Sequence, residues 1–225
     1  MTRTKLKDRT LPSYTKGEEV MNMVTHIVGA AFGVVQLTLC LVFSCIQHDG
    51  YKIVASVIYG SSIILLYTMS SIYHGLKPGM AKKVLQVIDH CTIYLLIAGT
   101  YTPIVLCPIR AASMSAGWIL FGIVWGLSAV AAVFTAIDHN RFKVLSMIFY
   151  IGIGWIIVFA LRLTIRAVTP VGFAYLLGGG IAYTVGAILY GLGKYRRYMH
   201  SVFHLFVLLG TGLQFVAVFE FCILQ

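Results

Sequence analysis

Long apolar stretches separated by short polar segments dominate the chain. An apolar run of about 20 residues is long enough to cross a bilayer as an α-helix, and a helix satisfies its backbone polar groups internally. Stretches of this kind lie at residues 21–46, 52–75, 86–108, 115–137, 143–162, 171–193 and 201–223. Alternating segments of about ten residues, typical of membrane β-barrels, do not occur. The pattern therefore predicts an all-α, polytopic membrane protein with seven transmembrane helices.

The composition supports this interpretation and excludes other classes. Apolar residues make up 59% and charged residues 11% of the 225 residues, whereas soluble domains carry about a quarter charged residues. Polar residues are too few for a disordered chain, and five cysteines are too few for a disulfide-rich secreted domain. The net charge of +10 is expected in loops. It predicts no nucleic-acid partner, and membrane lipids are the expected partners.

The basic residues are divided unevenly between the two sides of the predicted bundle. Thirteen of the 17 Lys and Arg fall in the N-terminal tail and the loops after the second, fourth and sixth spans. By the positive-inside rule the N-terminus is cytoplasmic, and an odd number of spans places the C-terminus outside. We expect a basic cytoplasmic tail at residues 1–20 and one transmembrane domain at residues 21–225. The tail is polar and no small-residue cleavage site follows it, which argues against a cleaved signal peptide.

Polar residues inside membrane spans are costly and by default indicate function. Those in this chain gather near the predicted cytoplasmic ends of four spans. They are Glu19, Asn22 and His26 in the first span, Ser70 and His74 in the second, Asp89 and His90 in the third, and His200 and His204 in the seventh. This convergence at one depth follows from the order of the spans alone.

The spacing of the histidines is typical of a metal site. His200 and His204 are four residues apart, so their side chains lie on one helix face. Two such imidazoles can share a tetrahedral metal with His74, which leaves a fourth position for water, as in catalytic zinc sites. Asp89 could hold that water or accept its proton, and Ser70 could bind the water or a substrate carbonyl. The sequence therefore predicts a zinc site.

Other interpretations of these residues stay open. A histidine pair at a membrane interface can contact lipid headgroups without a metal. Asp89 can cap its helix, where the helix dipole favours an acid. Glu19 and His26 can support the metal site through hydrogen bonds or brace the first span against its neighbours.

Three further polar residues on the same side receive no chemical role. We expect His90 to face lipid headgroups or the loop before the third span. Asp138 and His139 fall between the fourth and fifth spans and are expected to be solvated.

These motifs resemble those of the bacterial haemolysin III family. They are Glu19-x-x-Asn22-x-x-x-His26, Ser70-x-x-x-His74, Asp89-His90 with the continuation at residues 93–103, and His200-x-x-x-His204. They occur in the family's order at similar separations, and the resemblance covers residues 18–223. That family belongs to the progestin and adipoQ receptor superfamily, which is related to adiponectin receptors and more distantly to alkaline ceramidases.

The resemblance implies a seven-helix protein of the bacterial cytoplasmic (plasma) membrane with a zinc ion near its cytoplasmic face. By similarity, His74, His200 and His204 would be the zinc ligands. Asp89 would contact the metal through water, and Ser70 would lie close to it. Superfamily relatives are associated with the hydrolysis of lipid amides such as ceramides. Bacterial members are named for haemolysis and are linked to membrane homeostasis.

Three functions stay open from the sequence. The first is an intramembrane zinc-dependent hydrolase of a lipid amide or ester, with Asp89 as general base and then acid. The second is a sensor or regulator of the membrane in which zinc is structural and joins three helix ends. The third is a pore-former, which is least favoured because the spans lack a charged stripe that could line a pore. No oligomeric state is predicted.

Overall fold

The computed structural model describes residues 4–193 and 196–225, so Arg3 and Lys194 of the basic segments lie outside the described residues. Its regular structure in these ranges is helical, without strands. The main helices are α1 (Lys16–Ile46), α2 (Gly50–Gly75), α3 (Met80–Ile104), α4 (Arg110–Ala112), α5 (Met114–Asp138), α6 (Lys143–Gly154), α7 (Leu161–Leu192) and α8 (Met199–Val218). Shorter 3-10 or π segments are η1 (Leu6–Asp8), η2 (Val105–Ile109), η3 (Ile156–Ala160) and η4 (Phe219–Ile223).

Six helical segments among the described residues are long and apolar enough to cross a membrane. Five of them, Lys16–Ile46, Gly50–Gly75, Met80–Ala112, Met114–Asp138 and Met199–Ile223, each contain one predicted span. The remaining segment, Lys143–Leu192, is 50 residues long and covers the two predicted spans at 143–162 and 171–193. They form one segment because α6, η3 and α7 follow one another without a loop between them. The chain is therefore an all-helical, polytopic membrane protein.

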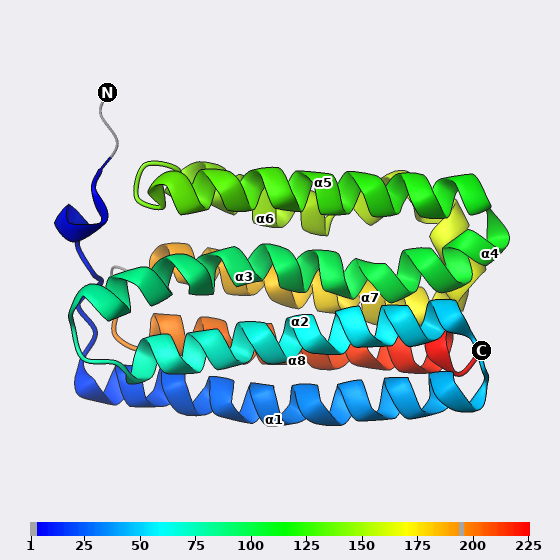
Figure 1. The fold of residues 1–225 in the computed structure, drawn as a ribbon, viewed down its shortest axis with the longest axis horizontal. Coiled ribbons are helices and arrows are strands. Elements are labelled where there is room, and N and C mark those ends of the chain that lie inside the picture. The colour runs from blue at the N-terminus through cyan, green and yellow to red at the C-terminus, as the bar shows by residue number, and fades with distance from the viewer. Residues whose placement is uncertain (1–3, 194–195) are drawn as a thin grey trace.

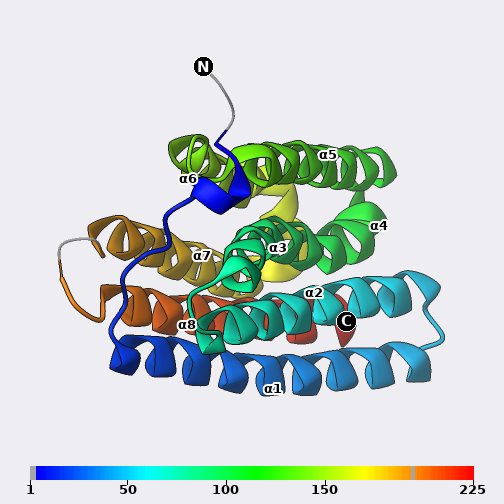
Figure 2. The same ribbon diagram turned by 60° about the vertical axis from the view of Figure 1, so that its left-hand side comes forward.

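The long segment changes direction along its length. Trp155 and Ala160, on either side of η3, leave helical geometry, and Thr169 has a φ of 64° directly before Pro170. A positive φ is unusual for a β-branched residue, and proline lacks the N–H that would continue the helix. In Figures 1 and 2, α6 lies beside α5, whereas α7 packs against α8.

Glycines allow two of the closest helix contacts. A Cβ on Gly99 in α3 would clash with the Ser62 hydroxyl in α2. A Cβ on Gly179 in α7 would lie 2.7 Å from the amide nitrogen of Gln214 in α8. Small residues of this kind let membrane helices approach closely, since lipid provides little hydrophobic drive for helix association. These contacts fix α3 and α7 beside the helices that carry the histidines.

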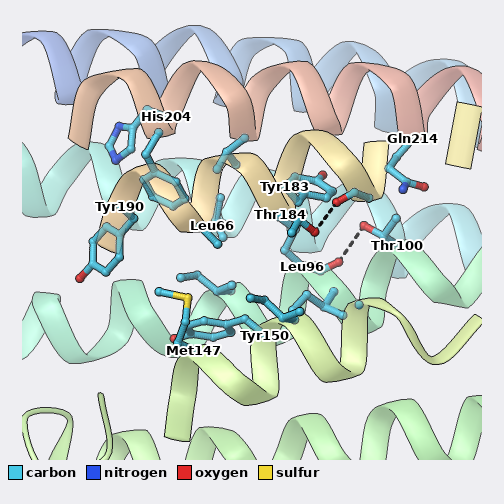
Figure 3. Close-up of a pocket in the computed structure, with 18 of the residues that line it drawn as sticks. Leu66, Leu96, Thr100, Met147, Tyr150, Tyr183, Thr184, Tyr190, His204 and Gln214 are labelled. Atoms are coloured by element: carbon cyan, nitrogen blue, oxygen red, sulfur yellow. Dashed lines mark hydrogen bonds between the residues drawn. The ribbon is translucent and has the colours of Figure 1, made fainter. Parts of the chain in front are cut away.

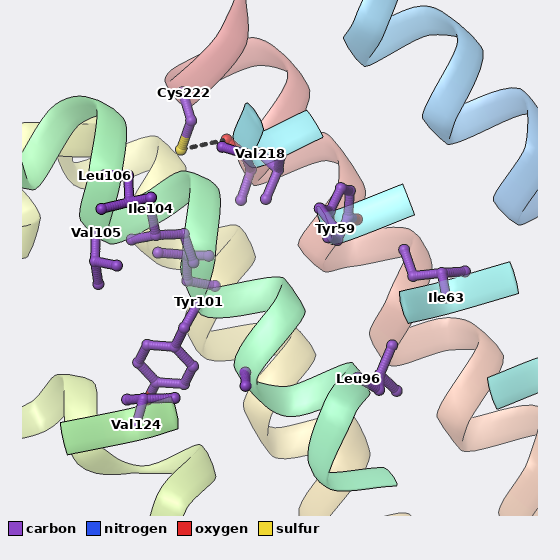
Figure 4. Close-up of a cluster of buried hydrophobic side chains, with 14 of the residues drawn as sticks. Tyr59, Ile63, Leu96, Tyr101, Ile104, Val105, Leu106, Val124, Val218 and Cys222 are labelled. Atoms are coloured by element: carbon purple, nitrogen blue, oxygen red, sulfur yellow. Dashed lines mark hydrogen bonds between the residues drawn. The ribbon is translucent and has the colours of Figure 1, made fainter. Parts of the chain in front are cut away.

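One part of the apolar core lies at the end of the bundle away from those histidines. Figure 4 shows Ile104 and Val105, where α3 passes into η2, close to Val218 at the end of α8 and Cys222 in η4. At the other end, the beginnings of α1, α3 and α8 and the end of α2 come together (Figure 1). The polar residues of the first, second, third and seventh predicted spans therefore share one end of the bundle.

Candidate metal centre

Three histidine side chains meet at this end of the bundle. His74 comes from the last turn of α2, and His200 and His204 come from the first turns of α8. Their ligand nitrogens all lie within 4.8 Å of one another. Nε2 of His200 is 3.3 Å from Nε2 of His74 and 3.0 Å from Nε2 of His204. Nitrogens that bind a tetrahedral zinc ion at 2.0–2.1 Å lie about 3.3 Å apart, so the three imidazoles fit a single metal ion.

His74 is oriented by residues of α1. Its Nδ1 lies 2.7 Å from Oε2 of Glu19 and 3.5 Å from Nδ2 of Asn22. Lys82 donates to the other Glu19 oxygen at 2.6 Å and so balances the carboxylate charge. A histidine that binds a metal usually donates its second N–H to a carboxylate, which fixes the tautomer. The Glu19 contact therefore leaves Nε2 of His74 available for a metal.

His204 has two neighbours in α1. The Thr25 hydroxyl lies 3.4 Å from Nδ1 of His204, and the His26 ring stacks on the His204 ring with centroids 3.6 Å apart. His26 is buried, and neither of its ring nitrogens has a hydrogen-bond partner in the described part of the chain. It therefore packs against the cluster without a hydrogen bond to it. The sequence reasoning missed Thr25, although its spacing of three residues from Asn22 places both on one helix face.

Tyr14, just before α1, covers the cluster and was also missed. Its ring stacks on His200 with centroids 5.1 Å apart and lies 5.9 Å from His74. Burial raises the pKa of the Tyr14 phenol above its usual range, and nearby carboxylates add to this effect, so the phenol is neutral. No local pattern indicates this contact, because it depends on the path of the N-terminal segment across the bundle end.

Asp89 and Ser70 lie in the wall of a cavity that also reaches His200 and His204. Ser70 donates a hydrogen bond to the Asp89 carboxylate, and Oδ2 of Asp89 is 3.7 Å from Nδ1 of His90. The structure therefore brings an acid, a hydroxyl and the histidines to the same space. This arrangement can bind a polar group of a ligand next to a metal.

The rest of the cavity is elongated and mainly apolar. Its volume is 180 Å³, and Figure 3 shows it extending from His204 past Leu66 and Leu96 to Gln214. His204 and Gln214 are ten residues apart on α8, a distance of about 15 Å at the rise of an α-helix. This is about half the thickness of a bilayer's hydrocarbon core, so the cavity has the length of one extended lipid chain.

The expectation for His90 was incomplete. Its ring contacts another helix as well: its Nε2 lies 3.5 Å from the Tyr190 hydroxyl of α7, and its Nδ1 lies 2.7 Å from the Gln86 carbonyl of α3. His90 also lines the cavity beside Asp89. Its position between α3 and α7 depends on how those helices are arranged.

The expectation that Asp138 and His139 are solvated was wrong. They are only 1% and 4% exposed, and the His139 ring packs against the His90 ring with centroids 4.0 Å apart. The Thr4 amide donates to Oδ2 of Asp138 at 2.8 Å, across 134 residues of sequence. Burial lowers the pKa of His139 to about 4, and the neighbouring positive charges of Lys143 and Arg9 add to the shift. His139 is therefore neutral at pH 7.

The fold and the cluster together describe a polytopic helical membrane protein with a candidate three-histidine metal centre. A family model described as "Haemolysin-III related" matches residues 14–215, which include all the polar residues of the centre. The chain belongs to this family. It is 35% identical over 210 residues to the "Hemolysin-3 homolog" of Bacillus subtilis (strain 168), covering 93% of this chain and 97% of the relative. It is 36% identical over 207 residues to "Hemolysin-3" of Bacillus cereus, covering 92% and 90%.

Proposed function

We propose that this protein is a zinc-dependent hydrolase that cleaves lipid amides or esters inside the membrane. The observation that carries the proposal is that two histidines of the cluster, His200 and His204, line the head of an elongated apolar cavity together with Asp89 and Ser70. A lipid chain would fill the cavity, and its carbonyl would lie beside the polar residues. Apolar walls with a few convergent polar groups are typical of sites for small hydrophobic ligands.

The zinc assignment rests on the donor set. His74, His200 and His204 would hold the ion through their Nε2 atoms, and imidazole ligands with an open position favour zinc among common metals. When bound, zinc supplies Lewis acidity toward a carbonyl and lowers the pKa of water into the neutral range. Glu19 and Thr25 would hold two of the rings in orientation through their Nδ1 atoms.

Asp89 would carry the proton. Its carboxylate can accept a proton from the attacking water as the new C–O bond forms, and return it to the leaving nitrogen or oxygen as that bond breaks. Ser70 positions the carboxylate through its hydrogen bond. The product acid and the released amine or alcohol then account for all atoms of substrate and water.

We further propose that the chain crosses the membrane seven times with its N-terminus in the cytoplasm of a bacterium. A straight helix as long as Lys143–Leu192 would measure about 75 Å, against about 30 Å for the hydrocarbon core. The break around Thr169 and Pro170 supports two crossings by this segment. In Figure 1 the beginning of α1 and the C-terminus lie at opposite ends of the bundle, as an odd number of crossings requires.

Metal content and turnover, measured together, test the hydrolase. We would purify the protein in detergent, determine zinc by mass spectrometry, and assay fatty-acid release from an N-acyl lipid. We expect about one zinc per chain with turnover, loss of both in His204→Ala, and loss of turnover alone in Asp89→Asn. His48→Asn is the matched control, since His48 is exposed at the other end of α1 and its positive φ suits asparagine.

The outcomes separate the alternatives. Wild-type protein that folds without metal contradicts the whole proposal. Bound metal without turnover contradicts the hydrolase and leaves a structural ion that joins α2 to α8. Full turnover in Asp89→Asn contradicts the assigned base.

A further inference from the structure

Arg9, in the N-terminal segment, is buried without adequate partners. It is 3% exposed, and its Nη2 donates to the Ile137 carbonyl at 2.9 Å. Its Nε and Nη1 are buried and have no hydrogen-bond partner among the described residues. A guanidinium remains charged at any physiological pH, and a buried charge with unpaired donors is costly. This arrangement therefore indicates a ligand that supplies acceptors.

The nearby acid does not meet this need. Asp138 attracts Arg9 electrostatically, yet its carboxylate accepts hydrogen bonds from the Thr4 amide at 2.8 Å and the Arg141 amide at 3.2 Å. Among the described residues, no acid forms an ion pair with Arg9.

Arg9 lines a second cavity, separate from the histidine cluster. This cavity has a volume of 170 Å³ and lies between the N-terminal segment, α3 and α5. Its other walls are apolar and come from Leu6, Val84, Val87, Ile88 and Ala136. Val84 and Ile88 are also more than a third exposed, on the first turns of α3. The cavity thus joins a surface that faces lipid.

We propose that Arg9 and this cavity form a binding site for the phosphodiester of a membrane phospholipid. The N–H groups on Nε and Nη1 of the guanidinium match phosphate oxygens, which arginine binds in charge-assisted hydrogen bonds. The apolar walls accommodate the start of the lipid chains. A free phosphate ion would leave this apolar part of the cavity unfilled. The bound lipid would hold the N-terminal segment across the bundle end. The site requires the chain to be in a membrane, and it does not depend on hydrolysis.

Lipid titration with a matched set of probes tests this site. We would use the full chain in neutral detergent and follow lipid adducts by native mass spectrometry. The probes are phosphatidylglycerol, diacylglycerol with the same chains but no phosphate, and inorganic phosphate. We expect one tightly bound phosphatidylglycerol in the wild type, binding about tenfold weaker in Arg9→Gln, and no comparable binding of diacylglycerol.

Two further variants make the test specific. Arg196→Gln removes an exposed arginine near the same end and should bind phosphatidylglycerol like the wild type. Ile88→Trp fills the apolar part of the cavity and keeps Arg9, so it should also weaken binding of the lipid. If Arg9→Gln fails to fold, this variant alone tests the proposed site. Equal binding by wild type, Arg9→Gln and Ile88→Trp overturns the site. Inorganic phosphate that binds as tightly as the lipid and competes with it overturns the lipid assignment in favour of a free anion.

Discussion

Oε2 of Glu19 in α1 lies 2.7 Å from Nδ1 of His74 in α2, although the two residues are 55 positions apart in the chain. A capping box between Thr15 and Glu18 sets the start of α1 and so the position of Glu19. Lys82 from α3 holds the second carboxylate oxygen. Three helices therefore determine the orientation of one candidate metal ligand.

Removing this carboxylate should weaken metal binding. We expect Glu19→Ala to lower zinc affinity by about 10- to 100-fold, because the partners of ligand histidines fix their tautomer and raise their basicity. Competition with a chelator of known affinity measures the change. Glu220→Ala, at an exposed position in η4, is the control. Equal zinc affinities in the two variants would show that Glu19 does not support the metal.

Ser70→Ala should separate positioning from metal binding. The variant loses the hydrogen bond to Asp89, and we expect turnover to fall about tenfold, with unchanged zinc content. Ser70→Thr keeps the hydroxyl and should restore most activity. A variant that loses zinc together with activity would instead indicate a structural role.

The length of the apolar cavity should set substrate preference. Leu96 lines the cavity between its two ends, as Figure 3 shows, and Leu96→Trp would fill that space. We expect turnover of long-chain amides to fall about tenfold relative to short-chain amides, as overfilling a packed site costs about 1–3 kcal/mol. Ile123→Trp, on a surface that faces outward in α5, is the control. An unchanged chain-length preference in Leu96→Trp would argue that substrate lies elsewhere.

Close contact between α2 and α3 should make Gly99 intolerant of a side chain. A Cβ there would clash with the Ser62 side chain, so we expect Gly99→Ala to cost about 1–3 kcal/mol of unfolding free energy. Gly122→Ala has no atom within 4 Å of the new Cβ and should be neutral or slightly stabilising. Thermal unfolding in detergent compares them. Similar melting temperatures for both variants would contradict this account of the contact.

Tyr14 should protect the metal from solvent. The stacked ring covers His200, so Tyr14→Ala should release zinc to a chelator severalfold faster than the wild type. Tyr14→Phe keeps the ring and should release it at the wild-type rate. Stopped-flow measurement with a chromophoric chelator follows the release. If Tyr14→Ala releases zinc as slowly as Tyr14→Phe and the wild type, the N-terminal segment does not control access to the metal.

Several features of the candidate site were predictable because they depend on local spacing. The spacing of His200 and His204 places both on one helix face, and the order of the spans places His74 and Asp89 at the same end. Tyr14 lacked a comparable signal, since it contacts a histidine far away in the chain, whereas Thr25 shares a helix face with Asn22. The burial of Asp138 was equally unpredictable, because the Thr4 amide reaches it from the N-terminal segment, and His139 packs against the His90 ring of α3.

The sequence by itself determined the class of this protein: apolar runs long enough to cross a bilayer must form helices there, because lipid offers the backbone no other hydrogen-bond partners. It also determined which polar residues share one depth. Only the tertiary structure decided that Nε2 of His74 in α2 lies 3.3 Å from Nε2 of His200 in α8, and that Glu19 meets His74. Such distances depend on how closely helices approach, which glycines such as Gly99 permit and packing between remote segments sets.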